Sequence, residues 1–162
     1  MRLRWIAALG ALPALHSAYA AVYLTPEQAQ RAAFPAATAF VPAEGDAARP
    51  ALVVWEARDA TQRLGWLLVD RVIGRTEEIT YALALDAAGT VLSLEVLEYR
   101  ETHGGEIRLP AWRKQFVGRS AAHPPQFGSD IKNIVGATLS CRHVSDGVAA
   151  LLQFHARRLA SR

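Results

Sequence analysis

The stretch ITYALALDAAGTVLSLEV, residues 79–96, decides the fold of this chain. Its first half alternates large apolar residues with smaller or polar ones, which is typical of a strand with one buried face. Its second half repeats the alternation. Between the halves, residues 86–89 end in Gly89, which can take the positive φ that a tight turn requires. The stretch therefore predicts a β-hairpin. The side chains expected on its buried face are Ile79, Tyr81, Leu83, Leu85, Leu92, Leu94 and Val96.

Two further strands are expected before this hairpin. Residues 52–57 form a short apolar run, and residues 64–72 alternate in the same way as the hairpin. The connections are short, which favours antiparallel neighbours. The side chains expected to share one face of the longer strand are Leu64, Trp66, Leu68 and Val72. Together the patterns predict three or four antiparallel strands in chain order.

A helix is expected before the strands. Thr25 is a suitable N-cap, Pro26 suits the first helical position, and Gln28 completes a capping box. The helix should end near Phe34, because the proline that follows disfavours helix in the residue before it. Residues 36–50, rich in alanine, proline and glycine, are expected to form an irregular connection.

Helices are also expected after the strands. A polar loop at residues 99–106 leads to a short helix over residues 110–116, and a long helix begins near Thr138 or Ser140. Its apolar positions recur at helical spacing. These positions are Val144, Val148, Leu151, Leu152, His155 and Leu159. Because His155 falls on this stripe, we expect it to be a buried histidine with its hydrogen bonds satisfied.

This order of elements, without alternation of strand and helix, predicts an α+β domain. We expect a curved antiparallel sheet of three to five strands, covered by helices on one side, as one domain after a signal peptide. Residues 21–59 would hold the first helix, the connection and the first strand. Residues 60–158 would hold the rest of the domain.

Residues 1–20 have the pattern of a secretory signal. Arg2 and Arg4 precede a short apolar run, and Ala18-Tyr19-Ala20 is a typical cleavage site. The chain is therefore expected to be exported to the periplasm. The sequence leaves open whether the segment is cleaved, is retained as a membrane anchor, or is a buried helix.

Charge and cysteine content exclude several classes of function. Without residues 1–20, which hold Arg2 and Arg4 and no acidic residue, the formal net charge falls from +3 to +1. The chain has no dense basic stripe, so nucleic-acid binding is not expected. Its single cysteine, Cys141, excludes an internal disulfide and sites built on paired thiolates, and is expected to be a small buried residue. The histidines lack metal-ligand spacing, so no metal site is expected.

The segment DIKNIVGATLS, residues 130–140, is the best candidate for chemistry. Gly136 and Ala137 are small and leave room for a bulky group near the backbone, and Thr138 follows them at the expected helix start. Free N–H groups and the helix dipole favour a phosphate at such a place. The same pattern also fits an ordinary helix cap with no ligand.

Several segments of the chain resemble one known family. These are Gly136-Ala137-Thr138, the sequence ETHGGE at residues 101–106, and two tryptophan-containing segments at residues 65–66 and 110–118. Over about residues 60–155 the chain resembles the FMN-binding domain. That domain occurs in the G subunit of Rnf electron-transport complexes, in the C subunit of sodium-translocating NADH:quinone reductase, and in small exported proteins.

The resemblance implies a cofactor, its site and its partners. The cofactor would be FMN, carried on the hydroxyl of Thr138 through a phosphoester made by a flavin transferase that takes FMN from FAD. The flavin ring would lie near the loop that begins at Glu101. Thr102, Arg108 or Lys132 would stabilise the reduced ring. The residues expected to bind the cofactor are Thr138, Ala137, Gly136, Leu139, Ser140, Glu101, Thr102, His103 and Gly104.

The chain departs from the family pattern D-x-x-S/T-G-A-T/S at two positions. Val135 stands where the pattern has Ser or Thr, and Lys132 stands where it has Asp. In the loop, His103 replaces a proline. These departures leave open whether FMN is covalently attached or only bound.

The expected function is an exported electron carrier with a redox partner protein at the membrane. Two alternatives stay open: a flavin-free module of a membrane redox complex, and a flavin-dependent oxidoreductase that acts on a small substrate. Other catalytic classes are not supported, because the chain has no G-x-S-x-G, P-loop or G-x-G-x-x-G motif.

Overall fold

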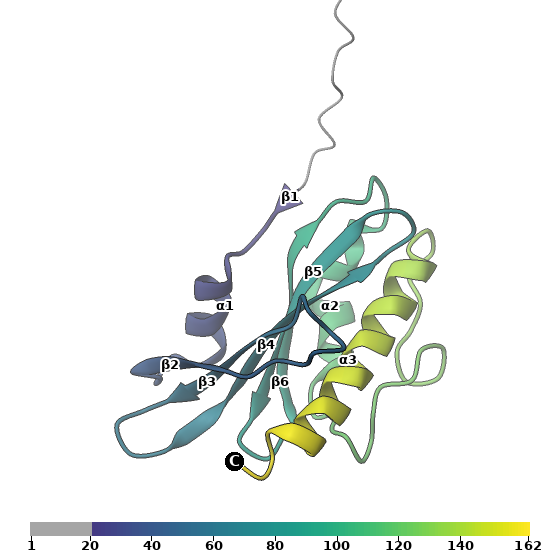
Figure 1. Ribbon diagram of the computed structural model, residues 1–162. Helices are drawn as coiled ribbons and strands as arrows, with labels where there is room; N and C mark the ends of the chain where they lie inside the picture. Colours follow the sequence, from purple (N-terminus) through teal and green to yellow (C-terminus); the bar gives the residue numbers. More distant parts are fainter. Residues whose placement is uncertain (1–20) are drawn as a thin grey trace, which may run out of the picture.

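The computed structural model describes residues 21–162, so the predicted signal peptide at residues 1–20 lies outside the described residues. Its centre is a six-stranded antiparallel sheet in the order β1-β6-β5-β4-β3-β2 (Figure 1). The strands are β1 (Ala21–Val22), β2 (Ala39–Ala43), β3 (Val53–Arg58), β4 (Arg63–Ile73), β5 (Glu78–Asp86) and β6 (Val91–Tyr99). The expected hairpin is confirmed as β5 and β6, and Gly89 has a φ of 87° in the turn between them.

Three α-helices accompany the sheet. They are α1 (Pro26–Ala33), α2 (Pro110–Arg113) and α3 (Thr138–Arg158), with short 3₁₀ turns η1 (Gly105–Arg108) and η2 (Lys114–Phe116) on either side of α2. The capping box predicted at Thr25 and Gln28 is confirmed by both of its hydrogen bonds. In the part of the chain that the structure describes, no helix has the length and apolar character needed to span a membrane.

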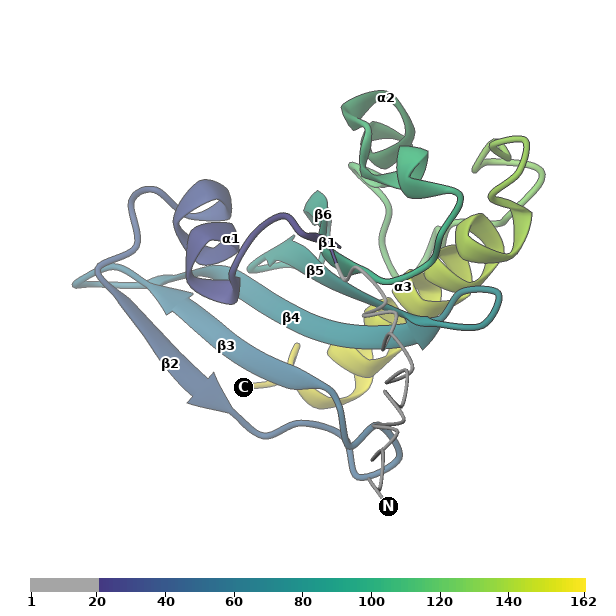
Figure 2. The same cartoon turned by 90° about the horizontal axis from the view of Figure 1, so that it is seen from above.

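Helices cover both faces of the curved sheet, not one face as the sequence suggested (Figure 2). On one face, α3 and the α2 segment enclose the larger apolar core, which includes Trp66, Tyr81 and Phe116. On the other face, α1 encloses a smaller core that includes Phe34 and Leu67. The second core was missed because the residues that β5 contributes to it are the small Ala82 and Ala84, which read as polar-face positions in the alternation.

The sheet also has more strands than expected. Residues 36–50 were expected to be irregular, but β2 lies within them and pairs with β3, and the very short β1 pairs with β6. Both are edge strands. The sequence of β2 is AFVPA, and Pro42 and the alanines have low strand propensity. Pairing with a neighbouring strand therefore overrides local propensity here.

Two residues point away from the face predicted for them. Leu64 packs into the α1 core, although it was grouped with Trp66, and Leu92 is 42% exposed, although it was grouped with Leu94. The pairing registers shift next to both residues: Ala57 pairs with Gly65 while Arg58 pairs with Arg63, and Ala84 pairs with Ser93 while Leu85 pairs with Val91. Such bulges insert an extra residue and reverse the alternation.

Helix α3 packs tightly on the sheet along its predicted apolar stripe, all of which is buried. The approach is close at Gly147, where a Cβ would lie 2.5 Å from the hydroxyl of Tyr81 on β5. The stripe includes His155, whose ring meets Trp66 edge-on at a centroid distance of 6.2 Å. The prediction that His155 is satisfied was wrong, because its buried Nε2 has no hydrogen-bond partner in residues 21–162. Burial lowers the pKa of His155 and keeps the ring neutral.

A substitution at Gly89, in the turn between β5 and β6, tests the packing of α3 on the sheet. An alanine there would need a positive φ and would place its Cβ 2.4 Å from Nδ1 of the buried His155 ring. We expect Gly89→Ala to lower the free energy of unfolding by about 3 kcal/mol, measured by urea denaturation. Gly118→Ala is the matched control, because Gly118 also has a positive φ but no atom lies within 4 Å of its Cβ position. It should cost about 1 kcal/mol, and equal losses in the two variants would contradict the packing.

Candidate functional site

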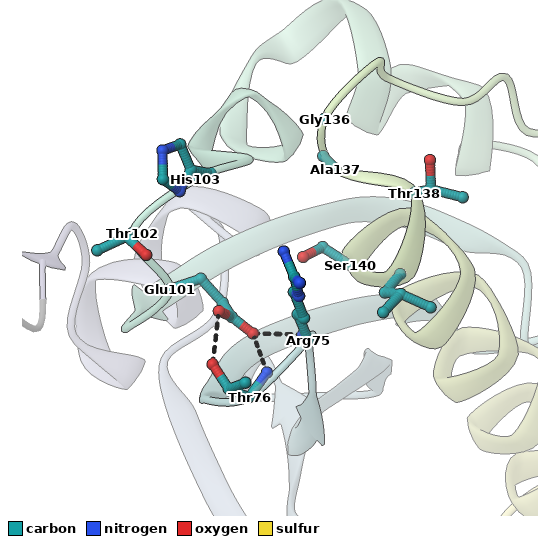
Figure 3. Close-up of a pocket in the computed structure, with 10 residues that line it drawn as sticks. Arg75, Thr76, Glu101, Thr102, His103, Gly136, Ala137, Thr138 and Ser140 are labelled. Atoms are coloured by element: carbon teal, nitrogen blue, oxygen red, sulfur yellow. Dashed lines mark hydrogen bonds between the residues drawn. The ribbon is translucent and has the colours of Figure 1, made fainter.

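A cleft of about 900 Å³ lies at one end of the sheet (Figure 3). Three segments that are distant in the sequence form it: the turn at residues 74–77 between β4 and β5, the loop that follows β6, and the start of α3. The residues that line it are Arg75, Thr76, Glu101, Thr102, His103, Gly136, Ala137, Thr138, Leu139 and Ser140. Antiparallel pairing brings the first two segments to the same end, because Ile79 pairs with Tyr99.

The start of α3 presents backbone donors to this cleft. Gly136 has a φ of 87°, Ala137 is the N-cap, and no side chain caps the helix. The first N–H groups of a helix have no intrahelical acceptor, and the helix dipole makes this end positive. The first turn of α3 also has no acidic residue. An anionic group is therefore favoured here.

Thr138 stands at the first position of α3 with an exposed side chain. Its Oγ1 accepts a hydrogen bond of 3.0 Å from Nδ2 of Asn133, five residues earlier. This bond uses the oxygen as an acceptor only, so the hydroxyl hydrogen is available to another group.

A buried contact joins the loop after β6 to the start of α3. The hydroxyl of Tyr99 donates to the carbonyl oxygen of His103 and lies 3.2 Å from Oγ of Ser140. Burial raises the pKa of Tyr99, so its hydroxyl stays protonated and can donate. Gly104 has a φ of 91°, and a Cβ there would lie 2.8 Å from Cβ of Ala137. The loop and the helix start are thus held in direct contact.

Glu101 joins the same loop to the turn at residues 74–77. Its carboxylate accepts hydrogen bonds from the backbone N–H groups of Arg75 and Thr76 and from the Thr76 hydroxyl (Figure 3). It also accepts one from the backbone N–H of Glu77. Partial burial raises the pKa of Glu101, but these hydrogen bonds outweigh it and leave the pKa below its usual value of 4.5. The carboxylate is therefore ionised at neutral pH and holds the turn.

The structure brings together the residues that the sequence singled out. Eight of the nine line the cleft, and Gly104 lies directly behind it, against Ala137. Glu101 is among the lining residues, and its carboxylate is bonded to the turn at residues 74–77. Within residues 21–162, no three His, Cys, Asp or Glu side chains are close enough to hold a metal ion.

The expected cationic donors, Arg108 and Lys132, do not line the cleft. The guanidinium of Arg108 lies over the ring of Tyr23, 5.0 Å from its centroid, and Lys132 borders a separate groove beside α2. Arg75 and Thr76, which sequence reasoning missed, line it instead, and of the two only Arg75 is cationic. The antiparallel strand order could have identified these two residues, because the turn between β4 and β5 must lie beside the end of β6.

Comparison with known proteins gives two matches. Residues 74–153 match the family model of the FMN-binding domain. The G subunit of the ion-translocating oxidoreductase complex of Stutzerimonas stutzeri is 31% identical over 124 residues, which cover 70% of this chain and 54% of that protein. The chain thus spans about half the length of this curated relative. The matched region contains all three segments of the cleft.

The hold of Glu101 on the turn predicts a specific pH dependence. A carboxyl with a lowered pKa stabilises the native state above its unfolded pKa, and this stabilisation is lost as the pH falls through the folded pKa. We expect Glu101→Gln to lower the free energy of unfolding by about 2 kcal/mol at pH 7, and the difference from wild type to shrink below about pH 4.5. Urea denaturation across this range measures it.

Glu77→Gln is the control for this test, because it removes an exposed carboxyl from the same turn. It should change the free energy of unfolding by no more than about 0.5 kcal/mol. A loss in Glu101→Gln that stays constant between pH 7 and low pH would contradict the assigned bonds.

Proposed function

Because residues 74–153 belong to the FMN-binding domain family, we propose that this chain is a flavoprotein that carries electrons between redox partners. Its cofactor is FMN. The observation that carries the proposal is the cleft at the start of α3, where backbone donors, small residues and a free hydroxyl meet.

The residues of the cleft fit FMN in size and in charge. A volume of about 900 Å³ lies within the range of pockets that take small ligands and cofactors. The N–H groups of Thr138, Leu139 and Ser140 at the positive end of α3 suit the phosphate. Gly136 and Ala137 add no bulk beside it, so the phosphate can approach the backbone.

The bound flavin would accept and release the electrons. The chain's own residues bind and orient it. Thr102 and His103 would border the ring from the loop after β6, and the contact of Tyr99 with Ser140 would keep that loop at a fixed position relative to the phosphate site.

We also propose that FMN is attached covalently to Thr138. In this step the Thr138 Oγ1 attacks the FMN phosphorus of FAD, a new phosphoester bond forms, the diphosphate bond breaks, AMP leaves, and the hydroxyl proton passes to solvent or to the transferase. Two observations support it. Asn133 orients the hydroxyl, and the neighbouring Val135 is 97% exposed, so an enzyme can reach the segment.

The proposed partners are a flavin transferase and a redox protein at the membrane. The relative from Stutzerimonas stutzeri is named as a subunit of an ion-translocating oxidoreductase complex, which supports a membrane redox partner. The signal-like pattern of residues 1–20 supports export to the periplasm, with the segment either cleaved or kept as an anchor.

Intact-protein mass spectrometry tests the covalent link. Co-expression of the full chain with a flavin transferase should add the mass of FMN less one water, and proteolysis should place it on the peptide that contains Thr138. Thr138→Ala should abolish the addition, and Thr138→Ser should keep it. Ser140→Ala, which removes the neighbouring hydroxyl of the same cleft, should also keep it. An unmodified wild-type chain beside an active transferase would refute the link.

Binding without the covalent bond is tested at Gly136. Gly136→Val adds a branched side chain at the phosphate site and should weaken FMN binding by the apo-protein at least tenfold, or about 1.4 kcal/mol, measured by fluorescence titration. Gly128→Val is the matched control, because Gly128 has a similar φ of 90° and equally open surroundings but does not line the cleft. Equal effects of the two variants on FMN affinity would argue against this site.

A further inference from the structure

The turn at residues 74–77 is the part of the cleft to which sequence patterns assign no role. It forms a third wall, beside the loop after β6 and the start of α3, and contributes Arg75 and Thr76 to the lining. Figure 3 shows the Arg75 side chain rising from this turn into the space between Thr102 and Ser140.

The turn is held from two sides. Glu101 binds its backbone N–H groups, as described above. From α3, Nδ1 of His143 lies 2.6 Å from the carbonyl oxygen of Ile73 and 3.0 Å from that of Gly74. Both partners are acceptors, so Nδ1 must carry the hydrogen and donate. A Cβ at Gly74 would lie 2.7 Å from Oε1 of Glu101, so the glycine leaves room for this carboxylate against the turn.

Arg75 brings a positive charge to the cleft. It is the one arginine or lysine among the described residues that line the cleft, and its guanidinium makes no ion pair or hydrogen bond with any other described residue. The one lining carboxylate, Glu101, is occupied by the backbone of the turn. The guanidinium is therefore available to a ligand, while its backbone is fixed.

We propose that Arg75 stabilises the negative charge that the flavin ring gains on reduction, and so raises the reduction potential of the bound FMN. The role rests on the proposed function. A nearby cation favours the anionic form of a group. The phosphate has its own donors at the start of α3, where Thr138 lies on the other side of Ser140 from Arg75 in Figure 3. In Figure 3 the Arg75 side chain rises between Glu101 and Ser140, on the side of the helix start that faces the loop after β6, where we propose that the ring lies.

Redox titration of the FMN-loaded full chain tests this role. Arg75→Gln should weaken the binding of reduced relative to oxidised flavin about tenfold, which lowers the midpoint potential of a two-electron couple by about 30 mV. Arg75→Lys should restore most of the potential, because the charge returns. Arg71→Gln is the matched control: it removes the same charge from β4, but Arg71 pairs with Glu78 outside the cleft, so the potential should stay unchanged.

Binding of FMN and riboflavin to the oxidised apo-protein supplies the second readout. Arg75→Gln should leave the ratio of the two affinities unchanged, because riboflavin lacks only the phosphate. A variant that loses FMN affinity relative to riboflavin, with an unchanged potential, would place Arg75 on the phosphate and overturn the proposal. An unchanged potential with unchanged affinities would also overturn it, while the proposed function would stand. A wild-type chain that binds no flavin would overturn both.

Discussion

The close packing of α3 on the sheet is the constraint on which the rest of this structure depends. Gly147 lets the helix approach Tyr81 more closely than any other residue would, and the buried stripe of α3 holds this distance along its length. Because the helix is rigid, the packing of its middle also fixes where it begins. Thr138 and the free N–H groups therefore lie at the end of the sheet where β4 and β6 finish.

The cleft follows from this placement and from antiparallel strand order. Antiparallel pairing brings the turn at residues 74–77 and the loop after β6 to the same end of the sheet, and α3 supplies the third wall. Few contacts then fix the walls relative to one another. Glu101 joins loop to turn, His143 joins turn to helix, and Tyr99 joins loop to helix. Each wall is thus held by both of the others, which keeps a polar and exposed site in one shape.

Much of this arrangement could be predicted from the sequence, since it rests on strong local signals. The alternation in residues 79–96, the capping box at Thr25 and the apolar stripe of α3 each identify an element, and the Gly136-Ala137-Thr138 segment indicates one wall of the candidate cleft. The misses have tertiary causes. β2 forms because β3 offers it a partner, Leu64 and Leu92 lie at bulges, and α1 covers a second face through small alanines. Arg75 was missed because it joins the cleft only through tertiary contacts with the loop after β6 and the start of α3, and no local sequence pattern marks it.

The exposure of Val135 bears on how such a site evolves. Its side chain contacts almost nothing, so folding places no demand on the residue at this position. A change between serine, threonine and valine there is nearly neutral for stability, in contrast to one at Gly104 or Gly74, where an added Cβ would lie 2.6 Å and 2.7 Å from the nearest side-chain atom. One amino-acid substitution can therefore remove or restore the hydroxyl next to Gly136 without a change in the fold. Only selection for recognition by a modifying enzyme would conserve it, while the architecture of the cleft persists in either case.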